Sequence, residues 1–121
     1  MLHNSNSQAQ TVNEQYKELS NIMKTAHAVR KDEGITMSTA LRLAWKSYRL
    51  KSQMKSEVVH FAFRKIDGTL REAVGTLVAD LVPKYERKTD RPHTPSYTTQ
   101  CYYDLDRGNF RCYRVASLLL N

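Results

Sequence analysis

Positively charged residues recur along one stretch of the chain with no acidic residue among them. No Asp or Glu occurs between Thr36 and Ser56. Within this stretch, Arg42, Lys46 and Arg49 follow the 4,3 spacing that places side chains on one face of a helix. Such a row of cations, over roughly 30 Å of helix, can bind successive phosphates or an acidic protein surface. The alternative is a solvated face opposite an apolar one, and the sequence leaves both interpretations open.

A second pair of cations, Arg64 and Arg71, lies at equal distances from the dipeptide Asp67-Gly68. Asp-Gly between alternating runs is a strong hairpin signal, because both central residues of the favoured turn need positive φ. A two-residue turn at this dipeptide pairs Arg64 with Arg71. Like charges directly opposite each other are unfavourable unless an anion lies between them. We therefore expect either a phosphate or carboxylate between the two arginines, or two side chains that splay into water.

Tyrosine and arginine also alternate in the C-terminal segment, residues 97–115. Tyr102 and Tyr113 lie near Arg111 and Arg114, a pattern in which tyrosines stack on bases while guanidinium groups hold phosphates. The competing interpretation is that strands favour aromatic residues in any case.

The same segment contains both cysteines of the chain. A hairpin that closes around residues 105–108 brings Cys101 opposite Cys112. This geometry permits a cross-strand disulfide, but in the cytoplasm thiols stay reduced. The favoured interpretation is therefore two small buried hydrophobic residues. No CxxC spacing or histidine cluster accompanies them, so we expect no metal site.

The chain offers little for catalysis. General acid–base or nucleophilic chemistry needs a base within reach of the reacting group and a third group that orients it. The four histidines lie far apart in the sequence, and no Gly-rich phosphate loop is present. We therefore expect a protein that is not an enzyme and that needs no cofactor.

Length and charge set the class of partner. A chain of 121 residues supports one core, and a net charge of +7 favours polyanions or acidic protein surfaces. The first residues contain no early positive cluster followed by an apolar run, so we expect no signal peptide, and no apolar run approaches the roughly 18 residues of a membrane span. We expect a cytoplasmic protein without a membrane partner.

Two helices and a small sheet must position these side chains. Residues 1–11 are polar and are expected to form a disordered tail, with a capping box at Thr11. Residues 12–56 show helical spacing broken at Gly34, which predicts a helical hairpin. After this point the period changes to 2, so residues 57–121 predict short strands in an antiparallel sheet or barrel. Residues 83–96 contain all three prolines and are expected to form an exposed loop whose cations suit contact with a nucleic-acid backbone.

The strand half resembles a known family. The run V-x-F-x-F-x-K-x-D-G-T-x-R-x-A-x-G-T, residues 59–76, is followed by YYDLDRGNFRCYRV, residues 102–115. Together they resemble the WYL-like domain family with an Sm-like SH3 β-barrel fold, over residues 57–120. The resemblance implies an Sm-like SH3 β-barrel for this half of the chain. Together with the helices expected from the spacing, the predicted fold is α+β, with an N-terminal helical hairpin followed by a small antiparallel SH3/Sm-like β-barrel packed as one unit. The basic residues of the motif correspond to Lys65, Arg71, Arg111 and Arg114.

The resemblance also implies a biological setting. Members occur in small proteins of Bacteroidota, their phages and their mobile elements, and WYL proteins often lie near phage-defence systems. Related barrels commonly bind nucleic acid or nucleotide-like ligands.

Two hypotheses about function follow. The first is a small basic accessory protein that binds nucleic acid, DNA or RNA, and contacts phosphates through the cations of the second helix and of the barrel. The alternative is a protein-interaction module, such as a phage-encoded inhibitor whose positive surface docks on an acidic groove of a host defence protein. A helix-turn-helix built from the two helices is a third interpretation. An open edge strand can pair with another chain, so the sequence also allows a homo-oligomer.

Overall fold

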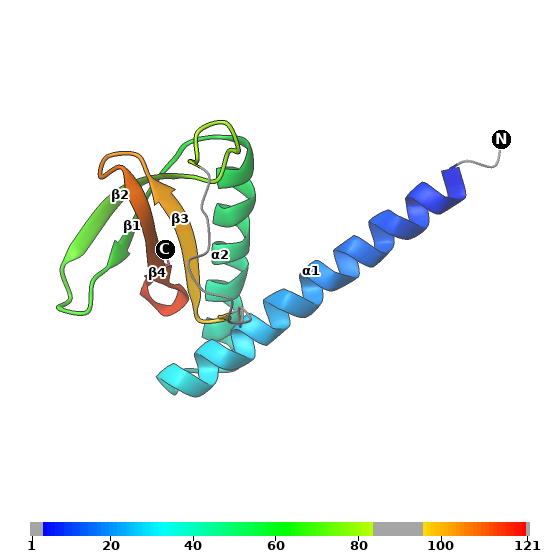
Figure 1. Ribbon diagram of the computed structural model, residues 1–121. Helices are drawn as coiled ribbons and strands as arrows, with labels where there is room; N and C mark the ends of the chain where they lie inside the picture. The colour runs from blue at the N-terminus through cyan, green and yellow to red at the C-terminus, as the bar shows by residue number, and fades with distance from the viewer. Residues whose placement is uncertain (1–3, 84–95, 121) are drawn as a thin grey trace, which may run out of the picture.

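The computed structural model describes residues 4–83 and 96–120, and of residues 4–12 it describes only the backbone. Within these residues, two helices are followed by a four-stranded antiparallel sheet (Figure 1). The chain is therefore a small α+β domain, as the sequence predicts. Residues 84–95, which carry the cations of the predicted proline-rich loop, lie outside the described residues.

Helix α1 spans Asn4–Glu33 and begins earlier than the sequence predicts. Most of the expected tail, residues 1–11, is thus helical, and Thr11 lies inside the helix instead of capping it. No proline or glycine interrupts residues 4–33, and extending an existing helix costs much less than nucleating a new one. In Figure 1 the N-terminal half of α1 projects away from the rest of the domain.

The predicted break in the helical spacing at Gly34 is confirmed. Gly34 adopts φ 64°, and its N–H donates to the carbonyl of Arg30 at 2.9 Å. Helix α2 spans Met37–Ser56, and the Thr36 hydroxyl caps it by accepting from the N–H of Thr39. The two helices pack through small and aliphatic side chains, among them Ile22, Ala26, Ala40 and Ala44.

The sheet contains β1 (Val59–Arg64), β2 (Leu70–Thr76), β3 (Thr99–Asp104) and β4 (Asn109–Arg114), in that spatial order. A short 3-10 helix, Val115–Ser117, follows β4, and Leu118 then forms an isolated bridge with Phe63 of β1. The C-terminal segment therefore returns to the first strand, as the closure of a small barrel requires.

The register of β1 and β2 differs from the sequence prediction. Arg64 pairs with Leu70, and Phe63 pairs with Arg71, so the predicted pair of facing arginines is wrong. Ile66 belongs to the loop. The N–H of Gly68, at φ 87°, donates to the carbonyl of Lys65, which closes a turn followed by a bulge. Since side chains alternate along a strand, Arg64 and Arg71 lie on opposite faces of the sheet.

The helices and the sheet share one core. From the sheet come Phe63, Ala73, Tyr102 and Tyr113; from the helices come Val29, Leu43, Leu50 and Met54; Val115 and Leu118 complete the cluster. Gly75 lies where three large side chains meet, because a Cβ there would approach Tyr102 Cδ2 to 2.7 Å. Gly75 nevertheless pairs regularly with Val59 of β1 and Asp104 of β3.

The end of α2 is bonded directly to the end of β2. The carbonyl of Met54 accepts from the N–H of Leu77 at 2.8 Å and from the buried hydroxyl of Thr76 at 3.3 Å. These bonds fix the first hairpin relative to α2.

Candidate functional site

Arg42, Lys46 and Arg49 line one groove of about 850 Å³ between α2, β1 and the C-terminal segment. Residues 59–62 of β1 form its opposite side, and residues 118–120 close it. We call this cavity the α2 groove. The structure therefore brings together the three cations that the sequence places on one helix face.

Trp45 supplies an aromatic surface inside the α2 groove. Its ring is half-buried, meets Tyr48 edge to face at 5.9 Å, and carries the guanidinium of Arg49 at 5.8 Å from its centre. The Lys46 ammonium donates to the carbonyl of Leu119. Arg42 and Arg49 are exposed. The groove thus combines cations with a flat apolar ring.

The remaining predicted residues line a second cavity of about 690 Å³ at the other end of β1. It includes a floor of aromatic rings and a rim that contains Ile66 and Phe110. We call it the arginine pocket. The site residues predicted from the sequence that line this pocket are Arg64, Arg71, Arg111, Arg114, Tyr102 and Tyr113, and Lys65 lines it as well.

Arg71 has a carboxylate partner inside the protein. Its guanidinium lies 3.4 Å from Asp104, and the two side chains are only 12% and 2% exposed. The Asp104 carboxylate also accepts from the N–H of Arg107 at 3.1 Å. In this register Arg71 pairs with the buried residue Phe63, so the Arg71 side chain points inward. Its charge therefore stabilises Asp104 inside the protein and is not available to a ligand.

The other cations of the pocket are more available. The Arg64 guanidinium donates to the carbonyl of Gly68 at 3.2 Å, and Arg111 Nε donates to Asn109 Oδ1 at 3.2 Å. Arg114 forms an ion pair with Glu33 at the end of α1. Across residues 13–83 and 96–120, the two ion pairs found are those of Arg71 and Arg114. Arg64, Lys65 and Arg111 therefore form no ion pair within these residues, although the Asp67 carboxylate also lines the pocket and interacts electrostatically with Lys65.

The prediction that Tyr102 and Tyr113 stack on bases is wrong. The two side chains are 0% and 2% exposed, and their rings pack edge to face against Phe61. The Tyr113 hydroxyl shares a hydrogen bond of 3.0 Å with Ser47 of α2. Burial raises the pKa of Tyr113 to about 12, although the bond to Ser47 acts in the opposite direction. Both tyrosines belong to the core because they alternate onto the inner face of the sheet.

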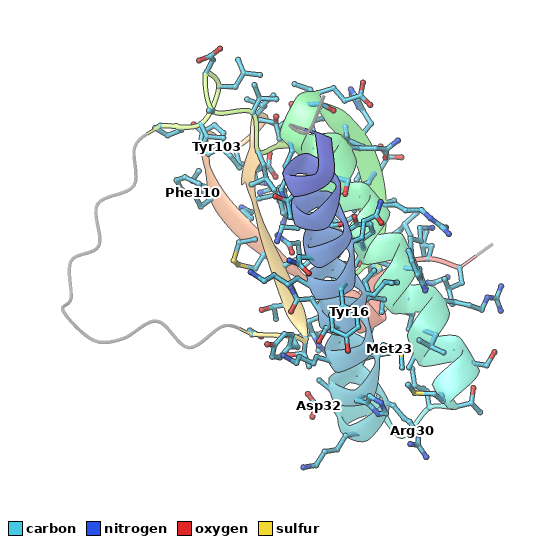
Figure 2. All side chains as sticks on the ribbon, turned by 90° about the vertical axis from the view of Figure 1, so that its right-hand side faces the viewer. Tyr16, Met23, Arg30, Asp32, Tyr103 and Phe110 are labelled. Carbon is cyan, nitrogen blue, oxygen red and sulfur yellow. A yellow bond between two sulfur atoms is a disulfide. The ribbon has the colours of Figure 1, made fainter. Side chains whose placement is uncertain are left out.

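The aromatic residues that reach the surface of this hairpin are Tyr103 and Phe110, which the sequence did not single out. They pair across β3 and β4 and meet edge to face at 5.3 Å, on the outer face of the hairpin (Figure 2). The signal was available, since the neighbour of an inward residue on a strand points outward. Phe110 also lines the arginine pocket.

Cys101 and Cys112 are joined in a disulfide. The predicted register is confirmed, but both residues are exposed, so the prediction of two buried thiols is wrong. They occupy directly opposite positions on the outer face, with their Cα atoms 4.0 Å apart, which is the geometry of the closer type of antiparallel pair.

The α2 groove and the arginine pocket adjoin each other. Residues 59–62 of β1 line the first, and residues 63–67 line the second. The C-terminal segment is divided in the same way, with Ser117 in the pocket and Leu118 in the groove. Cations and apolar surface therefore continue along one strand from α2 to the tip of the first hairpin.

The described residues contain no group of three His, Cys, Asp or Glu side chains suited to a metal ion. The helices of this part of the chain are likewise too short or too polar to cross a bilayer.

A family model described as WYL_2, Sm-like SH3 beta-barrel fold, matches residues 47–119, which is more than half of the chain. The chain belongs to the WYL_2 family. The WYL_2 match begins inside α2 and extends past Leu118, so it includes the end of the helix that carries Arg49 and the whole sheet. No match to a curated protein or to a solved structure was found.

Proposed function

We propose that this protein is a small accessory protein that binds single-stranded nucleic acid. The strand would lie along β1, from the α2 groove to the arginine pocket. Arg42, Lys46 and Arg49 contact phosphates at one end, and Arg64 and Arg111 contact them at the other. Arg71 holds the pocket in shape through Asp104.

One observation carries this proposal: two adjoining cavities share a single strand, and together they collect the cations of α2 and of the barrel. A summed positive field along such a track attracts a polyanion more strongly than scattered charges do.

Aromatic side chains favour a single strand over a duplex. Trp45 lies in the α2 groove and Phe110 at the rim of the arginine pocket. Unpaired bases stack on such rings, with about 1–3 kcal/mol per base, whereas a duplex keeps its bases stacked on each other. The proposed role is binding, without catalysis.

Fluorescence anisotropy with labelled single-stranded DNA and RNA, over a range of salt concentrations, tests the proposal. The triple variant Arg42→Gln, Lys46→Gln, Arg49→Gln should lower affinity at low salt by about tenfold or more, because phosphate contacts dominate such binding. The slope of log affinity against log salt should become shallower by about 2, since each single-strand phosphate contributes about 0.7.

A matched control removes the same charge elsewhere. Lys17, Lys24 and Lys31 are exposed on α1, away from both cavities. Their triple change to Gln should leave affinity nearly unchanged. If both triple variants weaken binding equally, affinity depends only on net charge, and the proposed binding path along β1 is refuted. If the unaltered protein binds no DNA or RNA at low salt, the proposed function fails.

A separate observation favours a second candidate, a protein-interaction module. Tyr16, Leu19 and Met23 are 73%, 48% and 42% exposed along α1. Figure 2 shows Tyr16 and Met23 on the outside of this helix. Exposed apolar side chains grouped on one element are typical of protein contacts. A stoichiometric complex that survives nuclease and is lost in Leu19→Glu would support this candidate.

A further inference from the structure

The disulfide lies on the solvent side of the second hairpin. Cys101 and Cys112 are both exposed, and along the ladder they lie between the pairs Thr99–Arg114 and Tyr103–Phe110. A reductant can therefore reach either sulfur without opening the core.

Other contacts besides this bond hold the hairpin together. Its strands pair over six residue pairs, and the N–H of Gly108 closes the turn by donating to the carbonyl of Asp104 at 2.8 Å. Tyr102 and Tyr113, one on each strand, are anchored in the core on the opposite face. We therefore expect the strands to stay paired and the domain to stay folded when the bond opens.

The bond nevertheless constrains the arginine pocket. Cys112 lines that pocket and follows Arg111 in β4. Strand β4 is the last in the sheet, and β3 joins β2 through only two residue pairs, Gly75–Asp104 and Thr76–Tyr103. The pairing of β4 with β3, which the disulfide joins at its middle, therefore helps to set the position of Arg111, alongside the anchoring of Tyr113 in the core.

We propose that Cys101–Cys112 is a reversible thiol–disulfide site, opened in the folded protein by a dithiol reductant, and that its oxidised form holds the arginine pocket ready for nucleic acid. The effect on binding rests on the proposed function. The reversible opening of the disulfide does not depend on the proposed function.

The chemistry balances with the dithiol as the named reductant. One of its thiolates attacks Cys101 Sγ, the bond between the two sulfurs breaks, and Cys112 leaves as a thiolate. The second thiol of the reductant then displaces Cys101. Two electrons and two protons pass to the protein, and the reductant becomes a disulfide.

The test treats the full chain with millimolar dithiothreitol under native conditions. Alkylation followed by mass measurement counts free thiols, and circular dichroism follows the fold. We expect two free thiols with an unchanged fold. Affinity for labelled single-stranded DNA should fall by about fivefold, the lower end for coupled sites. Reoxidation should restore it.

The variant Cys101→Ser, Cys112→Ser should bind like the reduced protein and should not respond to dithiothreitol. If it does not fold, the reduced and alkylated native chain provides the same comparison. A disulfide that resists dithiothreitol until the protein unfolds would overturn the proposed site.

The two proposals fail in different ways. Equal affinity before and after reduction would overturn the control of binding while leaving the binding function intact. An oxidised protein without affinity for nucleic acid would overturn the binding function, and the thiol count would still decide whether the bond is reversible.

Discussion

Arg71 illustrates how strongly the role of a residue depends on register. A turn one residue longer than predicted moves its guanidinium from an exposed position beside Arg64 to a buried position beside Asp104. A charge pair in such a position contributes little net stability, yet removing one partner leaves an uncompensated buried charge.

Asp104→Ala should therefore destabilise the protein by about 3–5 kcal/mol, measured by urea unfolding. The double variant Arg71→Met, Asp104→Ala should recover part of that loss, because no charge then remains buried. If Asp104→Ala unfolds at the same urea concentration as the native protein, the Arg71 guanidinium of that variant is hydrated and not buried without a partner.

Tyr113 links stability to alkaline pH. Burial raises its pKa from 10.0 to about 12, so the folded protein keeps the phenol proton that the unfolded chain releases near pH 10. This contribution is fully present below about pH 10 and is lost as the pH rises through 12. The difference corresponds to about 3 kcal/mol.

Unfolding by urea between pH 9 and pH 12 measures this effect against Tyr113→Phe, which cannot ionise. The variant should start less stable, because it loses the bond to Ser47, and should lose less stability over this range. Parallel decline of the two proteins would contradict the assignment.

At the scale of elements, local signals predicted much of the architecture. The stop at Gly34 and the hairpin that pairs Cys101 with Cys112 follow from turn and capping chemistry, which acts over a few residues.

The wrong predictions concern features that depend on residues far apart in the sequence but close in space. Asp67-Gly68 serves a two-residue turn and a turn with a bulge equally well, so the dipeptide alone does not reveal that Ile66 is a loop residue. The inner face of the sheet, which buries Tyr102 and Tyr113, depends on where α2 packs. The composition of the cavities could not be predicted for the same reason.

The hairpin between β1 and β2 should tolerate the loss of Ile66. This side chain is 92% exposed, and its deletion lets Asp67-Gly68 close directly on Lys65 and Thr69 while Arg64 still pairs with Leu70. We expect a change in the free energy of unfolding within about 1 kcal/mol.

The matched control deletes an exposed residue inside a strand. Removing Glu72 shifts the rest of β2 by one residue and turns its side chains to the opposite face, so the core should be lost. Urea unfolding distinguishes the two deletions. An unfolded Ile66 deletion beside a stable Glu72 deletion would refute the register.

For the whole molecule, the residues that match the family model are fewer than the residues that fold as one unit. The match begins at residue 47, but Val29 and Leu43 lie in the same buried cluster as the strand residues. The helices are thus part of the core instead of an appendage.

A chain truncated to residues 57–121 should therefore fail to fold, because it loses Leu50 and Met54 from the cluster that holds Tyr102. Circular dichroism and amide hydrogen exchange provide the measurement. A chain of residues 13–121, which retains both helices of the core, should keep a cooperative unfolding transition. Cooperative unfolding of residues 57–121 would show a self-sufficient barrel.

Trp45 is the single tryptophan of the chain, and it lies half-buried in the α2 groove beneath Arg49. Its emission therefore reports on that groove alone. A base stacked on the indole quenches the fluorescence, whereas a ligand held only in the arginine pocket leaves it unchanged. The protein thus contains an intrinsic optical probe that can time the arrival of a strand at one end of the track without any added label.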